Sequence, residues 1–121
     1  MQYKKTKKYK KTEFEIENEI LNWLNNQKNI LAFKVETNGY WDPKKQFYRK
    51  RKSKFVLPGT SDILGVYEGK FFAIEVKREK NYKISNNQLN FIYEIKKNGG
   101  IAGIAKNIEE AALLLGLDYK N

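Results

Sequence analysis

The sequence contains no cysteine and no histidine. Without cysteine there are no disulfide bonds, thiolate metal sites or cysteine nucleophiles, and this composition suits a reducing cytoplasm. Without histidine, every mechanism that needs an imidazole base or ligand is excluded, and with it the zincins and the histidine-based nucleases.

Long apolar runs are also missing. No stretch of 18 apolar residues is present, so the sequence predicts no membrane span, and the lysine-rich start lacks the apolar segment of a secretory signal. The 121 residues are 40% hydrophobic, which suffices for the core of a single domain. We expect a basic, flexible tail over residues 1–12 and one domain over residues 13–121.

Positive charge is abundant and unevenly distributed. The chain carries 24 basic and 14 acidic residues, a net charge of +10, and 13 of the 24 basic residues lie in the stretches 1–11 and 44–54. Tyrosine and phenylalanine are interleaved with both stretches, a pattern typical of nucleic-acid binding. The alternative is a solvated tail and loop that only aid solubility. No basic amphipathic helix supports a membrane surface as the partner.

Hydrophobic periodicity predicts an α/β fold with the order α-β-β-β-α-β-α and a mixed central sheet flanked by helices. Thr12 and Glu15 form a predicted capping box at the start of the first helix. A basic excursion over 40–59 is predicted to contain a further strand at 47–57. The predicted helices are 13–27, 85–98 and 107–116, and the other strands are 30–38, 62–67, 70–78 and 101–105.

Three charged residues occupy a hairpin that otherwise reads as buried. A two-residue turn at Glu68-Gly69 would place Asp62 opposite Glu75, unless a bulge near Gly65 shifts the register, with Lys77 on the same face as Glu75. Two opposed carboxylates at a covered strand end repel each other and lose solvation, and a divalent cation resolves both problems. Oxygen ligands alone favour Mg²⁺, with Mn²⁺ as a substitute. The alternative is a strand-end salt bridge in which Lys77 neutralises Glu75.

The ordered motifs resemble those of the PD-(D/E)XK nucleases, and the wider pattern is similar to their virus-type replication-repair branch, VRR-NUC. The match covers about residues 13–115 in the order Glu13, Thr37-Asn38-Gly39, Pro58-Gly59-Thr60-Ser61-Asp62, Ile74-Glu75-Val76-Lys77, Gln88 and Gly99-Gly100-Ile101-Ala102. Where the family often carries Arg-Asn-x-Gly after the first strand, this chain has Glu36 and Thr37 ahead of Asn38-Gly39.

The resemblance implies a restriction-endonuclease-like fold and metal-dependent hydrolysis of phosphodiester bonds in DNA. It implies that Asp62, Glu75 and the Val76 backbone carbonyl bind the metal, that Lys77 orients the attacking water, and that Gln88 positions that water or Lys77. The general base is left open between a metal-bound hydroxide, Lys77 and a substrate phosphate. The relatives include resolvases of Holliday junctions that act as dimers, and stand-alone phage proteins of this length. We therefore expect a homodimer acting on branched DNA in a prokaryotic or phage-infected cell, without a small-molecule cofactor.

The first helix offers more than one carboxylate to such a site. Helical geometry places Glu13 and Glu17 on the inward arc and Glu15 and Glu19 outside. Glu13 is the better match to the family's helix glutamate, as a catalytic residue and possible metal ligand, and Glu17 is second. The alternative is that both only favour the helix N-terminus through its dipole.

Gln88 also has a local explanation, because Ser85 and Gln88 have the spacing of a capping box. For DNA binding we expect a basic set formed by Lys44, Lys45, Arg49, Lys50, Arg51, Lys52, Lys54 and Arg78. Two other functions remain open: a non-catalytic nucleic-acid-binding module on the same fold, and an RNA-binding or packaging protein in which the motif is coincidental.

Overall fold

The helices begin at side chains that cap them. In the computed structural model, which describes residues 10–36, 40–49 and 53–119, Thr12 caps α1 (Glu13–Asn25), Ser85 caps α2 (Asn86–Lys97) and Asn107 caps α3 (Ile108–Leu114). Each cap accepts a hydrogen bond from the backbone N–H three residues on, which satisfies one donor that the first turn leaves free. The capping boxes predicted from Thr12–Glu15 and Ser85–Gln88 are both present.

Four strands form one mixed sheet in the order β1-β4-β5-β6. β1 (Ile30–Lys34), β4 (Ile63–Tyr67) and β5 (Lys70–Val76) are antiparallel, and β6 (Ile101–Ala105) runs parallel to β5. Glu68 and Gly69 both have positive φ, 49° and 80°, as the tight turn of a two-residue hairpin requires. The predicted hairpin register is confirmed, because Ile63 pairs with Ile74 and Val66 with Phe71, and no bulge intervenes.

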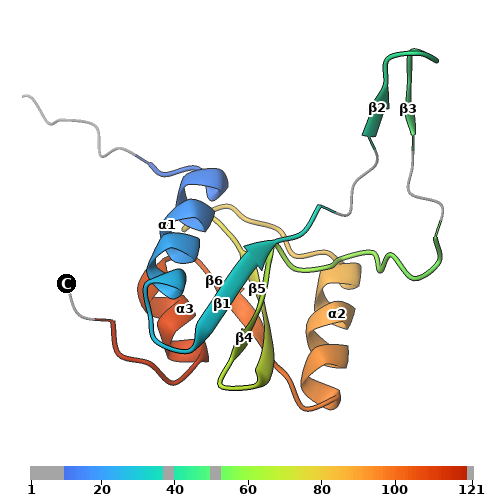
Figure 1. The fold of residues 1–121 in the computed structure, drawn as a ribbon. Coiled ribbons are helices and arrows are strands. Elements are labelled where there is room, and N and C mark those ends of the chain that lie inside the picture. The colour runs from blue at the N-terminus through green and yellow to red at the C-terminus, as the bar shows by residue number, and fades with distance from the viewer. Residues whose placement is uncertain (1–9, 37–39, 50–52, 120–121) are drawn as a thin grey trace, which may run out of the picture.

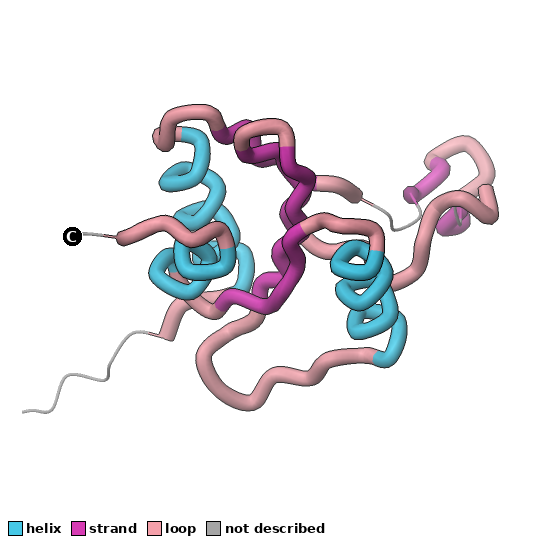
Figure 2. The backbone as a smooth tube through the Cα atoms, turned by 90° about the horizontal axis from the view of Figure 1, so that it is seen from below, coloured by secondary structure: helices cyan, strands magenta, loops and turns pink. Residues whose placement is uncertain are grey.

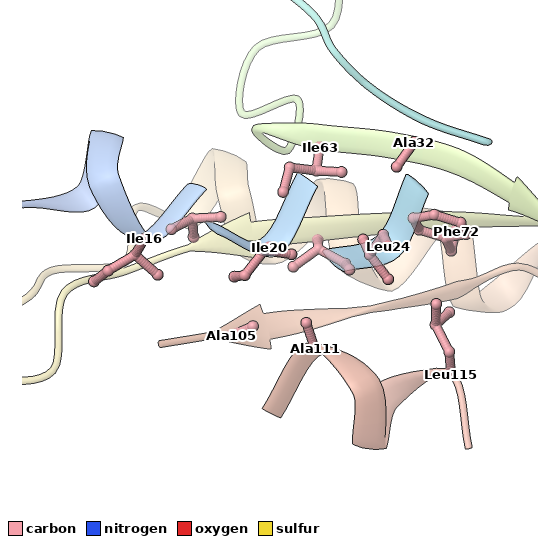
Figure 3. Close-up of a cluster of buried hydrophobic side chains, with 11 residues drawn as sticks. Ile16, Ile20, Leu24, Ala32, Ile63, Phe72, Ala105, Ala111 and Leu115 are labelled. Atoms are coloured by element: carbon pink, nitrogen blue, oxygen red, sulfur yellow. The ribbon is translucent and has the colours of Figure 1, made fainter. Parts of the chain in front are cut away.

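Helices cover both faces of the sheet, as the two apolar faces of the β4–β5 hairpin predict. Figure 2 shows the sheet between α1 and α3 on one side and α2 on the other. On the first side Ile20, Leu24 and Phe72 are fully buried (Figure 3). On the second, Phe91 of α2 packs with Ala73 and Ala102. The chain is therefore an α/β protein with three helices and a mixed four-stranded sheet in its described part.

The excursion between β1 and β4 differs from the prediction. The strand expected at 47–57 begins at Phe47 as predicted but is only three residues long: β2 (Tyr40–Asp42) and β3 (Phe47–Arg49) pair with each other as a separate hairpin that projects from the rest of the molecule (Figure 1). A turn over residues 43–46, with Gln46 at φ 54°, reverses the chain before β3. The predicted order α-β-β-β-α-β-α holds for the main sheet and its helices once this hairpin is set aside.

Most of the predicted helices and strands are too long at their C-terminal ends. β5 ends at Val76 rather than residue 78, and α3 ends at Leu114 rather than residue 116. β1 ends at Lys34 rather than residue 38, and α1 ends at Asn25 rather than residue 27. Asn25, the last residue of α1, ties the helix end to β1, because its side chain accepts from the Ala32 N–H at 2.8 Å and donates to the Ala32 carbonyl at 2.9 Å. None of the helices in the described ranges is long and apolar enough to cross a membrane.

Candidate active site

The β4–β5 hairpin brings Asp62 and Glu75 to the same end of the sheet. Asp62 directly precedes β4, and its Oδ2 accepts a hydrogen bond of 2.8 Å from the backbone N–H of Val76. This bond carries the Asp62 carboxylate across to the end of β5, next to Glu75. The pairing register of β4 and β5 therefore places the two carboxylates beside each other, as the sequence predicted.

Glu75 and Lys77 are buried although both are ionisable. Glu75 is 3% exposed and Lys77 is 7% exposed, and the Lys77 Nζ lies 3.6 Å from Glu75 Oε1. Glu75 lies in β5 and Lys77 directly follows it, and both fall on the face of Ala73, which α2 covers. This contact is the salt bridge that the alternative interpretation of the motif expected, but Asp62 adds a second carboxylate beside it.

Gln88 of α2 joins the cluster through both ends of its amide. Its Nε2 donates to Glu75 Oε1 at 2.8 Å, and its Oε1 accepts from Lys77 Nζ at 3.2 Å. The same Oε1 also accepts from the Ser85 backbone N–H at 2.9 Å, so the capping box and the contact with the cluster exist together. The local cap thus sets the position from which Gln88 reaches β5.

A glycine lets α2 approach the strand that carries Asp62. Gly59 has φ 79°, and a Cβ there would lie 2.2 Å from the Asn87 carbonyl carbon and 2.5 Å from the Gln88 backbone nitrogen. Only glycine fits this contact without moving one of the two backbones. The Pro58-Gly59 turn therefore helps to fix the distance between Asp62 and the first turn of α2.

The electrostatics of Glu75 favour the binding of a cation. Burial, together with repulsion from the neighbouring Asp62 carboxylate, raises the pKa of Glu75 to about 8, although the Lys77 ammonium acts in the opposite direction. Its Oε2 is buried and has no hydrogen-bond partner, which is a costly state for a carboxylate oxygen. A divalent cation would ligate this oxygen and neutralise the pair. The donors present therefore fit Mg²⁺ or Mn²⁺.

The helix carboxylate differs from the preferred prediction. Glu13 is exposed, and the expectation that it points inward is wrong, because it is the first residue of α1 and no layer covers that turn. Glu17 is buried as expected, at 8% exposure, and pairs with Lys34 at 3.0 Å. Lys34 is the ladder partner of Ile63, next to Asp62, so Glu17 belongs to the same end of the sheet.

The sequence did not reveal Lys34 as the partner of Glu17, since a lysine near the end of a half-exposed strand carries no signal of its own. Nor did it reveal Ser61, which is 1% exposed and whose Oγ has no hydrogen-bond partner. Because successive side chains of a strand point to opposite faces, the position of Asp62 on the α2 side would have placed Ser61 on the α1 side of the sheet.

Across residues 10–36, 40–49 and 53–119, no three acidic, histidine or cysteine side chains group as a metal site, so a cation would rely on two carboxylates and backbone oxygen.

The predicted DNA-binding residues lie in different places. Lys44 and Lys45 are exposed in the turn between β2 and β3, Arg49 ends β3, and Lys54 is exposed in the following segment. Arg78 is exposed directly after the buried Lys77. The remaining three, Lys50, Arg51 and Lys52, lie outside the described residues.

An apolar groove of about 610 Å³ lies beside the cluster on the α2 face and includes none of Asp62, Glu75, Lys77 and Gln88. Its wall is formed by Val35, Glu36, Phe55, Val56, Leu57, Thr60, Leu64, Phe71, Phe91 and Ile95. We assign the chemistry to the polar cluster rather than to this groove, because the groove offers a single titratable side chain, Glu36.

The fold and the cluster define an α/β protein with a buried glutamate and lysine, a half-buried aspartate and a glutamine at one end of its sheet. A scan against protein-family models finds no match to this chain, and a search of curated proteins finds no similar sequence.

Proposed function

We propose that this protein is a metal-dependent endonuclease of the PD-(D/E)XK type that hydrolyses phosphodiester bonds in DNA. The observation that carries the proposal is the cluster of Asp62, Glu75, Lys77 and Gln88, in which a buried carboxylate oxygen has no hydrogen-bond partner. The arrangement of α1, the β1-β4-β5-β6 sheet and α2 supports a restriction-endonuclease-like core.

Asp62, Glu75 and the Val76 carbonyl would hold the cation, and Glu17, which is buried at the same end of the sheet, would serve as the helix carboxylate in place of Glu13. A bound Mg²⁺ supplies Lewis-acid stabilisation of the charge that builds on the phosphate, and it lowers the pKa of water. The remaining tasks belong to side chains of the protein.

Lys77 is suited to act on the attacking water or on the phosphate. Its ammonium is held by Glu75 and by Gln88 Oε1, so its position is set before the substrate arrives. Its ammonium donates to Gln88 Oε1 and lies 3.6 Å from Glu75 Oε1, and an ammonium has three donors, so it can also donate to a water or a phosphate oxygen. Gln88 orients both Lys77 and Glu75 through its two amide groups.

Branched DNA is the substrate class we propose, and a homodimer is the form that would cut a junction twice. Two symmetric cuts across a four-way junction require two active sites related by a two-fold axis. The basic residues of the β2–β3 hairpin and of the segment that follows it would contact the DNA backbone.

The test compares wild type, Glu75→Gln and Lys77→Met on labelled four-way junction, flap, duplex and single-stranded DNA, each in Mg²⁺, Mn²⁺ and EDTA. We expect the wild type to cleave DNA in the Mg²⁺ and Mn²⁺ buffers. Both variants should cleave at least about 100-fold more slowly while they still bind DNA. Cleavage by Glu75→Gln at the wild-type rate would refute the assignment. Binding without cleavage in any buffer would instead establish a non-catalytic binding module.

A further inference from the structure

A second polar surface adjoins the catalytic cluster at the end of β5 and β6. These two strands are parallel, Val76 pairs with Ala105, and the Lys77 backbone N–H donates to the Ala105 carbonyl at 3.1 Å. The residues that follow the two strands therefore start side by side. Lys106 is the first residue beyond β6, directly across from the buried Lys77.

Lys106 is held in place by two neighbours. Its Nζ lies 5.7 Å from the centre of the Tyr82 ring and 3.8 Å from Glu110 Oε2. Its backbone N–H donates to the other oxygen of Glu110 at 2.8 Å. A cation that is already ordered loses little conformational freedom when it binds an anion, and both Lys106 and Tyr82 remain about one-third exposed.

Arg78 is ordered on the same loop. Its Nε–H and Nη2–H donate to the Asn81 carbonyl at 3.2 and 2.6 Å, and Asn81 has the left-handed φ of 59° that this turn needs. The guanidinium has five donors, so most of them stay available to an anion. Lys80 and Lys83 are exposed on either side of this turn.

The loop of residues 77–85 lies at the same end of the molecule from which the β2–β3 hairpin projects (Figure 1). The acidic side chains of the loop 77–85 and of the first turn of α3 are Glu79, Glu109 and Glu110, and Glu110 pairs with Lys106. The surface beside the cluster therefore presents Lys106 over the Tyr82 ring, with Arg78 ordered on the loop that carries Tyr82.

We propose that Tyr82, Lys106 and Arg78 bind a single-stranded segment of the nucleic acid next to the scissile phosphate. This inference rests on the proposed function and adds the form of the substrate. Ordered cations bind backbone phosphates, and an exposed aromatic ring stacks on an unpaired base, which a fully paired duplex cannot offer. The enzyme would thus select DNA that has an unpaired strand where the DNA leaves the active site.

The competing explanation is structural: the contact between Lys106 and Tyr82 would only anchor the loop. Measurements of binding separate the two, provided that cleavage is prevented. Anisotropy of a fluorescent thymidine oligonucleotide and of a blunt duplex of equal length, with the full chain in EDTA at several NaCl concentrations, gives affinity and salt dependence. The melting temperature of each variant reports on folding.

We expect Tyr82→Ala to weaken binding of the single strand about tenfold or more and binding of the duplex much less, whereas Tyr82→Phe retains wild-type affinity. Lys106→Gln should reduce the slope of log K against log salt for the single strand by about 0.7, the value of one phosphate contact. Lys97→Gln is the matched control, because Lys97 lies in the last turn of α2, nine residues and roughly 13 Å from Gln88.

Unchanged single-strand affinity in both Tyr82→Ala and Lys106→Gln would overturn the inference, as would an equal loss for duplex and single strand in Tyr82→Ala. Absence of single-strand binding by the wild type would also overturn it. The proposed nuclease activity fails by a different result, the absence of metal-dependent cleavage, so the two failures are distinguishable.

Discussion

Glu75 shows at the residue scale how an ionisable group is retained in an environment that opposes its charge. Its carboxylate is buried beside Asp62, and Lys77 and Gln88 share only one of its two oxygens. Replacing a buried ion pair as a whole with well-packed apolar side chains is often neutral or stabilising, so stability alone does not explain the Glu75–Lys77 pair. A binding role for a cation explains why this arrangement is present.

The stability of the metal-free protein should depend on the charge of Glu75. Its pKa rises from 4.5 to about 8 on folding, so between these values the folded state keeps a proton that the unfolded state has lost. The free energy of unfolding therefore falls as the pH rises from about 5 to 8. Melting curves in EDTA should show this decline for wild type and a flatter profile for Glu75→Gln.

Glu19→Gln is the control for that measurement, because Glu19 lies on α1 away from the cluster and pairs with Lys11. Its profile should follow the wild type. Parallel profiles for Glu75→Gln and wild type across this pH range would contradict the assigned environment of Glu75.

Gly59→Ala should destabilise the protein and disturb the cluster together. The left-handed φ alone costs about 1–2 kcal/mol for an alanine, and the added Cβ would also collide with the backbone of Asn87 and Gln88. Gly69→Ala is a matched control, since Gly69 has φ 80° and open space around its Cβ position. Urea unfolding should show a larger loss for Gly59→Ala, and equal losses would refute the close packing.

At the scale of elements, the β2–β3 hairpin is separate from the main sheet. Replacing residues 40–49 with a short glycine-serine linker should therefore change the melting temperature by only a few degrees. The replacement removes Lys44, Lys45 and Arg49, so the salt slope for duplex binding should fall by up to about 3. Anisotropy titrations at several salt concentrations measure this slope.

A variant that keeps the hairpin but has Lys44, Lys45 and Arg49 changed to serine should show the same reduction in salt slope. A large drop in melting temperature on replacement of the hairpin would show instead that the hairpin packs on the body. An unchanged slope in both proteins would remove the hairpin from the DNA-binding surface.

For the whole molecule, binding of a cation should appear as thermal stability. At a Mg²⁺ concentration 100-fold above its dissociation constant, the folded state gains roughly 2.7 kcal/mol, which corresponds to several degrees in melting temperature. Asp62→Asn should lose this response. Calorimetry in MgCl₂ and in NaCl of equal ionic strength makes the comparison, and equal shifts in the two salts would argue against a specific site.

Local sequence patterns were sufficient for much of the architecture. The capping boxes, the Glu68-Gly69 turn and the period of two in the hairpin are short-range features, and they predicted α1, α2 and the register that places Asp62 beside Glu75. They depend on residues close together in the chain, whose geometry is set by backbone sterics and hydrogen bonding.

Tertiary packing decided the rest. Which α1 glutamate is buried depends on how far the sheet extends beneath the helix, and this left Glu13 exposed and Glu17 paired with Lys34. The contact of Lys106 with Tyr82 joins residues 24 positions apart, and the strand predicted at 47–57 became part of a separate hairpin. Such contacts arise only when layers pack, because burial and charge pairing act between residues that no local pattern relates.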